Sequence, residues 1–170
     1  AYVYDTFLDS IQDDFGEREG LLFVGGFAHP PNADAVLWFA REIFPLIRRE
    51  LPDVKFYVAG SKVTDEIKAL EETEGGIIIK GFVSEEELAQ LYGQCRVVVV
   101  PLRYGAGVKG KVVEAIYNGA PIVTTSTGAE GIPFADTVLE IEDQAESFAR
   151  KTVELYQDKE RLNQLCHRTQ

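Results

Sequence analysis

The chain is predicted to fold as an open, doubly wound parallel α/β sheet of about six strands, of the Rossmann-like class. Two observations predict this fold. Short apolar runs alternate about six times with stretches of three- and four-residue hydrophobic spacing, as in successive βαβ units. Several of these runs are hydrophobic throughout, which is typical of strands that helices cover on both faces.

The first half of the chain is expected to contain three strands, at residues 21–24, 54–59 and 77–80. Three helices are expected to accompany them, from Asn32 to about Leu51, over 64–72 and from Ser84 to about Tyr92. Asn32 is expected to cap the first of these helices. Ser84 is followed by Glu87 three residues later, and this capping box predicts where the third helix begins.

The second half is expected to contain strands at 97–100, 121–125 and 138–141. Helices are expected at 109–118, where Gly119 closes the element, and at 146–156. Three parts of the chain follow from this pattern: an acidic lead-in over 1–20, one domain over 21–158 and a polar tail over 159–170. Ligands of such sheets bind beyond the carboxyl ends of the strands, where the strand order reverses.

Composition and charge exclude several classes of function. The chain has 170 residues, with 17 basic and 28 acidic side chains and a formal net charge of −11, so neither nucleic acid nor a broad anionic membrane surface is an expected partner. Its two cysteines predict free thiols and a cytoplasmic location, and no apolar run reaches the length of a membrane span. The dispersed cysteines and histidines predict no metal site. The absence of methionine predicts that the chain is part of a longer protein.

One segment is basic in an otherwise acidic chain. The 26 residues between Glu87 and Glu114 contain no acid, where about four would be expected from the composition. The segment holds four basic residues: Arg96, Arg103, Lys109 and Lys111. A basic loop that opens into a helix N-terminus favours an anion, most often phosphate, over ordinary surface charge.

Glycines support an anion site in the same loop. Gly105, Gly107 and Gly110 lie within six residues, which we call the glycine loop (residues 105–110), and their backbone N–H groups could turn toward an anion. The alternative is a flexible loop. The spacing also matches the dinucleotide pattern G-x-G-x-x-G, but this loop follows the fourth strand and no acidic residue ends the next one, so an NAD site is disfavoured.

Two further positions are candidates. Gly25 and Gly26 follow the first strand, where a phosphate could reach their backbone; His29, nearby, is more often simply solvated. Glu114 lies one turn beyond the basic loop among apolar neighbours. It could pair with Lys111 on the helix surface, or it could accept hydrogen bonds from two ribose hydroxyls.

Several short segments then stand in a characteristic order: residues 22–26, 31–32, 56–60, 80–83, 88–92, 100–101, 105–115 and 119–123. The most specific is GAGVKGKVVEA at 105–115, followed by GAPIV at 119–123. This ordered set resembles the carboxyl-terminal, donor-binding domain of GT-B fold glycosyltransferases of family 4, the glycosyl transferases group 1. The resemblance covers most of the chain, from about Leu21 to Tyr156.

The resemblance implies a retaining transfer of a hexose-type sugar from a UDP-, GDP- or ADP-linked donor to a glycan or lipid acceptor. The second glutamate of the family's E-x7-E motif, which holds the ribose, falls on Glu114, whereas the first falls on Ala106. The resemblance also implies that the base contacts Phe82 and Val83. The arginine that many members carry in a V-G-R pattern is replaced by Gly26, so Lys109 and Arg103 would supply the positive charge at the diphosphate.

The resemblance further implies an amino-terminal, acceptor-binding domain outside this chain, through which any membrane contact would be made. It implies no cofactor. The alternatives are a related GT-B enzyme, such as a nucleotide-sugar epimerase or a phosphorylase, and a non-catalytic nucleotide-binding or signalling module.

Overall fold

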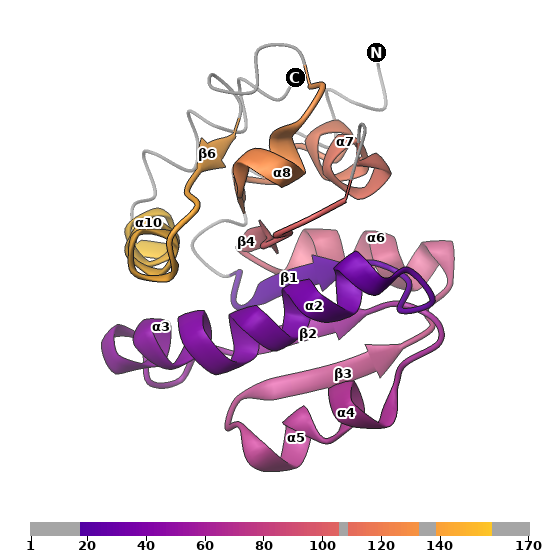
Figure 1. Ribbon diagram of the computed structural model, residues 1–170, viewed down its shortest axis with the longest axis horizontal. Coiled ribbons are helices and arrows are strands. Elements are labelled where there is room, and N and C mark those ends of the chain that lie inside the picture. The colour runs from indigo at the N-terminus through magenta and orange to yellow at the C-terminus, as the bar shows by residue number, and fades with distance from the viewer. Residues whose placement is uncertain (1–17, 106–108, 133–138, 158–170) are drawn as a thin grey trace.

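The computed structural model describes residues 18–105, 109–132 and 139–157. Its strands are β1 (Leu21–Val24), β2 (Phe56–Ala59), β3 (Ile77–Gly81), β4 (Val97–Val100), β5 (Ile122–Thr124) and β6 (Glu140–Ile141). They form one sheet in the order β3-β2-β1-β4-β5-β6, and each neighbouring pair is parallel (Figure 1). The predicted six-stranded, doubly wound parallel sheet is therefore confirmed.

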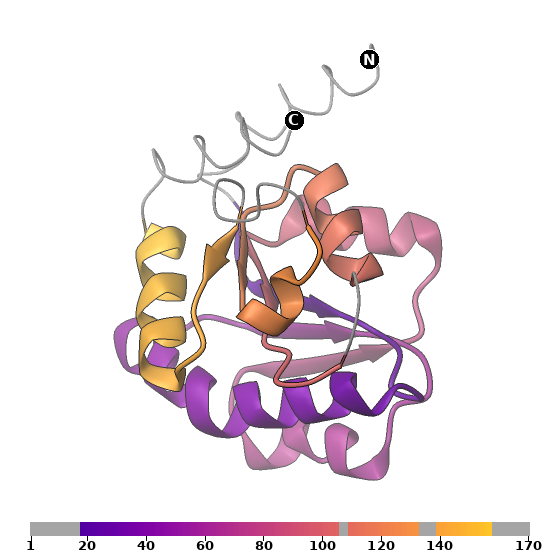
Figure 2. The same cartoon turned by 45° about the horizontal axis from the view of Figure 1, so that its top comes forward.

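Helices cover both faces of this sheet. On one face lie α2 (Pro30–Trp38), the π-helical segment η1 (Phe39–Ile43), α3 (Phe44–Glu50) and α10 (Ala145–Gln157), with α10 against α3. On the other face lie α6 (Glu85–Gln94) and α7 (Gly110–Tyr117) (Figure 2). The described residues also form α4 (Asp65–Lys68), α5 (Leu70–Thr73) and α8 (Ser126–Ala129), of which α8 was not predicted.

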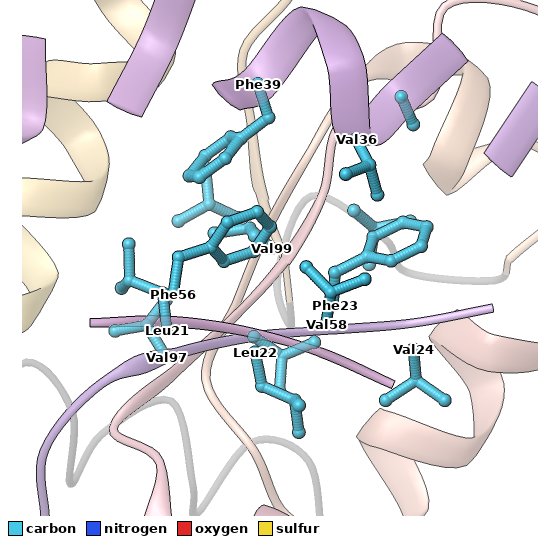
Figure 3. Close-up of a cluster of buried hydrophobic side chains, with 14 of the residues drawn as sticks. Leu21, Leu22, Phe23, Val24, Val36, Phe39, Phe56, Val58, Val97 and Val99 are labelled. Carbon is cyan, nitrogen blue, oxygen red and sulfur yellow. The ribbon is translucent and has the colours of Figure 1, made fainter. Parts of the chain in front are cut away.

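The core lies between α2–α3 and the central strands. Phe39 packs on Phe56 of β2 with ring centroids 4.5 Å apart, and Phe148 of α10 meets Phe39 edge-on at 6.0 Å. All four residues of β1 and all four of β4 are buried, as expected for strands covered on both faces (Figure 3). Burial of this apolar surface holds both layers to the sheet.

The first long helix begins earlier than the sequence predicted. His29 occupies the N-cap position and Pro30 the first turn, where a missing N–H costs nothing. Asn32 therefore lies inside the helix, and the prediction that it caps the helix is wrong. Its side-chain amide instead donates a hydrogen bond of 2.8 Å to the carbonyl oxygen of Gly26.

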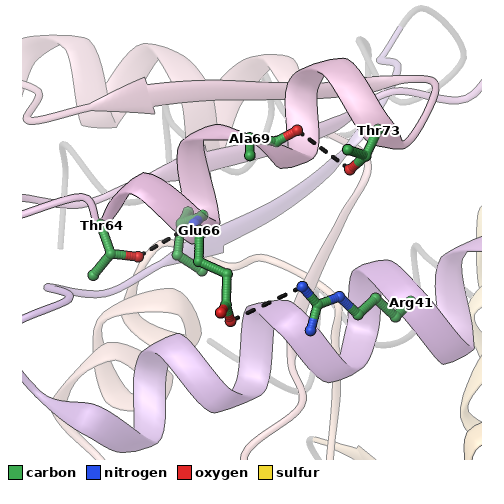
Figure 4. Close-up of polar contacts among 6 residues, drawn as sticks. Arg41, Thr64, Glu66, Ala69 and Thr73 are labelled. Atoms are coloured by element: carbon green, nitrogen blue, oxygen red, sulfur yellow. Dashed lines mark hydrogen bonds and ion pairs between the residues drawn. The ribbon is translucent and has the colours of Figure 1, made fainter.

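The predicted single helix over 64–72 is two short helices. Thr64 caps α4 by accepting a hydrogen bond from the Ile67 N–H, and Ala69 separates α4 from α5 (Figure 4). Arg41 and Glu66 form an exposed ion pair of 3.9 Å between η1 and α4. The predicted capping box at Ser84 and Glu87 is confirmed at the start of α6. Of the predicted lead-in over 1–20, only residues 18–20 are described, and the predicted tail over 159–170 lies outside the described residues.

Candidate functional site

The strand order reverses between β1 and β4. From β1 the chain proceeds outward to β2 and β3, returns to β4 on the other side of β1, and continues to β5 and β6. Leu21 pairs with Val97 and Leu22 with Val98, so the two strands lie side by side and their carboxyl ends share one edge of the sheet. The loops after β1 and β4 therefore flank the point where such sheets bind ligands.

Backbone contacts hold the loop after β1 (residues 25–29, the β1 loop) in place. The N–H of Gly25 donates to the carbonyl of Ala59 at 3.0 Å, and the N–H of Phe27 donates to that of Ser61 at 2.9 Å. A β-carbon on Gly25 would stand 2.9 Å from the side chain of Asn32. The predicted residues Gly25 and Gly26 thus form a fixed backbone segment at the end of β1.

The loop after β4 (residues 101–109, the β4 loop) reaches the first turn of α2 as well. Gly105 has a φ of +118°, a conformation that favours glycine. A β-carbon there would stand 3.5 Å from Pro31 and 3.7 Å from Cε of Lys109, so Gly105 lies between these two side chains. Lys109 is the N-cap of α7, which brings a cationic residue to the positive end of that helix.

The guanidinium of Arg103 forms an ion pair with the carboxylate of Asp34 on α2. Its Nε donates to Asp34 at 3.0 Å and its second guanidinium nitrogen donates to the other carboxylate oxygen at 2.6 Å. The guanidinium also lies over the ring of Trp38, 5.2 Å from its centroid. The hydrogen bonds to Asp34 raise the pKa of Arg103, which remains a cation. Trp38 is itself buried.

Glu114 lies on α7 and is half-buried. The buried Tyr92 of α6 is its neighbour: burial raises the pKa of Tyr92, and the negative charge of Glu114 raises it further. The Tyr92 hydroxyl has no hydrogen-bond partner among the described residues. The side chain of Lys111, the alternative partner of Glu114, lies outside the described residues, as does all of Gly107.

The predicted base-contacting residues share a pocket with the β1 loop. This pocket, of about 160 Å³, lies at the carboxyl ends of the first three strands. It is lined by Val24, Gly25, Gly26, Ala59, Gly60, Ser61, Phe82, Val83 and Leu88. Phe82 is 77% exposed at its rim, an unusual position for a phenylalanine. Residues predicted separately for a diphosphate and for a base are thus brought together.

A larger pocket of about 340 Å³ lies at the opposite edge of the sheet. It borders Gly20, Lys55 and Arg96, which directly precede β1, β2 and β4. We place the functional site at the smaller pocket because ligands of parallel α/β sheets bind at the carboxyl ends of the strands. Arg96, although part of the basic segment, therefore lies away from the site.

The role of the first two turns of α2 was not predicted. Pro31, Asn32 and Asp34 each contact one of the two loops, whereas the sequence predicted only a cap at Asn32. The sequence does show a polar, proline-rich segment at the start of this helix. The β4 loop that it contacts, however, lies far away in the sequence. Within the described residues, no group of three potential metal ligands gathers and no helix has the length and apolarity to cross a bilayer.

The fold is that of a Rossmann-like α/β domain, and its two loops lie at the reversal of strand order, where sheets of this class bind ligands. Residues 18–158 match the family described as glycosyl transferases group 1, and the chain belongs to that family. Its six-stranded parallel sheet is the carboxyl-terminal half of the GT-B fold.

Known proteins agree with this assignment. An uncharacterized 44.6 kDa protein in the cps region of Klebsiella pneumoniae is 35% identical over 117 residues, which are 65% of this chain and 30% of that relative. The C-terminal domain of the glycosyl transferase group 1 family protein LpcC from Francisella tularensis has a TM-score of 0.70 at 19% identity, with 95% of this chain and 87% of that chain covered. TarM has a TM-score of 0.72 at 16% identity, with 89% and 31% covered. The chain thus spans less than a third of the curated relative's length.

Proposed function

We propose that this domain binds the nucleoside diphosphate of a sugar donor for a glycosyltransferase reaction. One observation carries the proposal: the β1 loop and the β4 loop both contact the first two turns of α2, on either side of the reversal of strand order. Backbone N–H groups, a lysine and a helix N-terminus are thereby gathered where a diphosphate would sit.

Each group has a proposed role. The diphosphate would meet Lys109 and the backbone of Gly25, Gly26, Gly105, Gly107 and Gly110. Of the two predicted cations, we propose Lys109 as the direct contact because it lies in the glycine loop at the N-terminus of α7, whereas Arg103 forms two hydrogen bonds to Asp34 on α2. Glu114 would hold the ribose hydroxyls. The base would lie in the pocket at Phe82 and Val83, whose exposed aromatic ring offers a surface for stacking.

The chemical task of these groups is to stabilise the diphosphate as it leaves. Negative charge develops on it while the bond to the sugar breaks, and donors that are already oriented stabilise that charge without reorganising. The acceptor would be positioned by an amino-terminal domain of the full-length protein. The proposal includes a hexose-type sugar, retention of configuration, and a glycan or lipid acceptor. The likeness to a protein of a cps region supports a role in polysaccharide synthesis.

The decisive experiment compares nucleotides with pyrophosphate on a Glu114→Gln variant. Calorimetric titration with UDP, GDP and ADP identifies the base that wild-type protein prefers. Hydrogen bonds to a charged group contribute roughly 1.5–3 kcal/mol, so loss of the charge should weaken binding of that nucleotide about threefold to thirtyfold. Pyrophosphate has no ribose, so its affinity should hardly change. Equal losses for both ligands, or no loss for either, would contradict the ribose role.

Lys109→Ala tests the diphosphate contact. This change should weaken binding of both nucleotide and pyrophosphate by about tenfold or more, because it removes a charge-assisted contact. Lys151→Ala is the matched control, since Lys151 lies on α10 and pairs with Glu154 at 3.1 Å. Equal affinity of the Lys109→Ala variant and the control would argue against a diphosphate at the glycine loop.

The chain on its own should transfer no sugar to an added acceptor, because the acceptor domain is expected to form half of the cleft. Slow hydrolysis of the donor remains compatible with this expectation. Steady transfer by the chain alone, measured with a radiolabelled sugar donor, would contradict the division of the site between two domains.

A further inference from the structure

An unusual contact joins α2 to the β4 loop. Asp34 and Arg103 are 69 positions apart in the sequence, and yet they form a two-point hydrogen-bonded pair at 3.0 and 2.6 Å. Their side chains are 25% and 48% exposed. Exposed ion pairs usually contribute little to stability, but two parallel hydrogen bonds from a planar guanidinium fix geometry as well. The pair therefore specifies where the β4 loop lies.

Two neighbouring contacts act on the same loop. The guanidinium of Arg103 lies over Trp38, one helical turn beyond Asp34. Gly105, two residues after Arg103, lies against Pro31 in the first turn of α2. Arg103 and Gly105 are thus both held on one helix immediately before the rest of the glycine loop.

The Asp34–Arg103 pair lies where it can affect diphosphate binding. A loop with three glycines in six residues loses much conformational freedom when it is ordered around a ligand. Fixing its first residues in advance reduces that cost and so raises affinity. The guanidinium, meanwhile, already has a carboxylate as its counter-ion.

We propose that Asp34, Arg103 and Trp38 form a positioning unit that fixes the described start of the β4 loop, from Arg103 to Gly105, and that Asp34 and Arg103 strengthen diphosphate binding without contacting the anion. The proposal rests on the proposed function, since it concerns the same diphosphate site. It assigns Asp34 an indirect role in binding. Direct contact between its carboxylate and a diphosphate would be repulsive, because both are negatively charged.

The test is a charge exchange. Pyrophosphate and the preferred nucleoside diphosphate are titrated into wild type, Asp34→Arg, Arg103→Asp and the double variant carrying both changes. Each single change breaks the ion pair and should weaken binding of both ligands by about threefold to tenfold. The double variant re-forms the ion pair with reversed polarity and should recover most of the lost affinity. Glu66→Gln, which breaks the Arg41 pair elsewhere, should leave affinity unchanged.

Trp38 provides an independent readout, because it is the only tryptophan of the chain. Asp34→Asn keeps the size of the side chain but removes the charge that holds Arg103 over the indole ring. Its tryptophan emission should shift relative to wild type, and its affinity for pyrophosphate should fall together with that shift. Circular dichroism and urea unfolding establish that each variant is folded.

The opposite result is well defined. If Arg103 itself binds the diphosphate, Asp34→Asn frees it and affinity stays equal or rises, while the charge exchange gives no recovery. Either result would overturn the positioning unit and leave the proposed function intact. If wild-type protein binds none of UDP, GDP, ADP and pyrophosphate, the proposed function fails, and this inference fails with it.

Discussion

The two loops that flank the reversal of strand order are held in different ways. The β1 loop is fixed largely by its own backbone, through the hydrogen bond of Gly25 to the last residue of β2 and that of Phe27 to Ser61 just beyond it. The β4 loop is fixed by side chains, through Arg103 on Asp34 and through the Thr125 hydroxyl, which donates to the carbonyl of Leu102. The positive side chains of the site lie in the second loop.

This difference suggests that the two loops contribute differently, one mainly to stability and the other mainly to ligand binding. A loop tied through its backbone belongs to the cooperative fold, and disturbing it should cost global stability. A loop tied through side chains can be disturbed locally, so the effect should appear more strongly in ligand binding. The following substitutions test the contrast.

Gly60→Ala should have the largest effect on stability. A β-carbon at Gly60 would overlap the carbonyl of Gly25. A shift of Gly60 would disturb its hydrogen bond of 2.8 Å to Gly81, and a shift of Gly25 would disturb its hydrogen bond of 3.0 Å to Ala59. Overpacking of this kind costs about 3 kcal/mol of unfolding free energy, measured by urea denaturation. Gly93→Ala is the control: no described atom lies within 4 Å of the added carbon, so this helical position should gain about 0.5–1 kcal/mol. Equal stability of Gly60→Ala and wild type would refute the backbone account.

Thr125→Val should cause the second largest loss of stability. The buried Thr125 hydroxyl donates to Leu102 and accepts a hydrogen bond of 3.1 Å from the Gly128 N–H, so valine leaves two buried backbone groups without a partner. We expect a loss of about 2 kcal/mol in unfolding free energy. We also expect weaker pyrophosphate binding, since Leu102 adjoins Arg103. Thr125→Ser keeps the hydroxyl and should retain most of both properties; an equal loss in Thr125→Ser would assign the effect to packing.

Asn32→Ala should have a smaller effect on stability, about 1 kcal/mol, because it removes one hydrogen bond to a half-buried carbonyl. The substitution also clears the space that a β-carbon on Gly25 would occupy. Gly25→Ala should therefore be less destabilising in the Asn32→Ala background than in wild type. Additive losses in a double-mutant cycle would show that Asn32 does not restrict the β1 loop.

Glu71→Gln is a reference point far from both loops. Glu71 accepts a hydrogen bond of 2.7 Å from the Ile79 N–H and pairs with Lys68, and these contacts lower its pKa, the backbone hydrogen bond most. A lowered pKa in the folded state means that the ionised group stabilises the fold above its ordinary pKa, near 4.5, and that this contribution is lost as pH falls through the folded-state pKa.

The stability gap between wild type and Glu71→Gln should thus be about 0.5 kcal/mol near neutral pH, after screening by solvent, and should shrink in acid. Urea titrations at pH 7 and pH 3 measure it. Ligand affinity should not change. A gap that widens as pH falls would contradict the assigned direction of the pKa shift.

The sequence predicted the sheet well because each strand carries its own signal. Four consecutive apolar residues at 97–100 predict a buried strand regardless of their neighbours, and β4 has those bounds. Short helices were harder: no single residue marks the break at Ala69, and α8 has only four residues, with its Thr125 cap hidden at the end of a strand. The helix of 84–92 was placed well because its capping box is local.

The candidate site was predictable in its loops but not in its contacts. Glycines and lysines at strand ends can be read from the chain, so Gly25 and Lys109 were found. The pairing of Asp34 with Arg103 depends on the strand order, which brings positions 69 residues apart onto one helix. No local pattern distinguishes Asp34 from any other exposed acid on a helix.

The π-helical turn between α2 and α3 has a consequence for related chains of different length. One extra residue in a turn rotates all that follows by about 100°. Here Phe44 and Ile47, which follow the π-helical turn, are buried, and Pro45 lies in the first turn of α3, where a proline is tolerated. Deleting the exposed Arg41 would leave a regular helix with the wrong face turned inward. A relative lacking one residue at 39–43 should therefore also lack the proline and carry its hydrophobic residues one position out of phase, so a single-residue gap inside a helix would be the correct alignment.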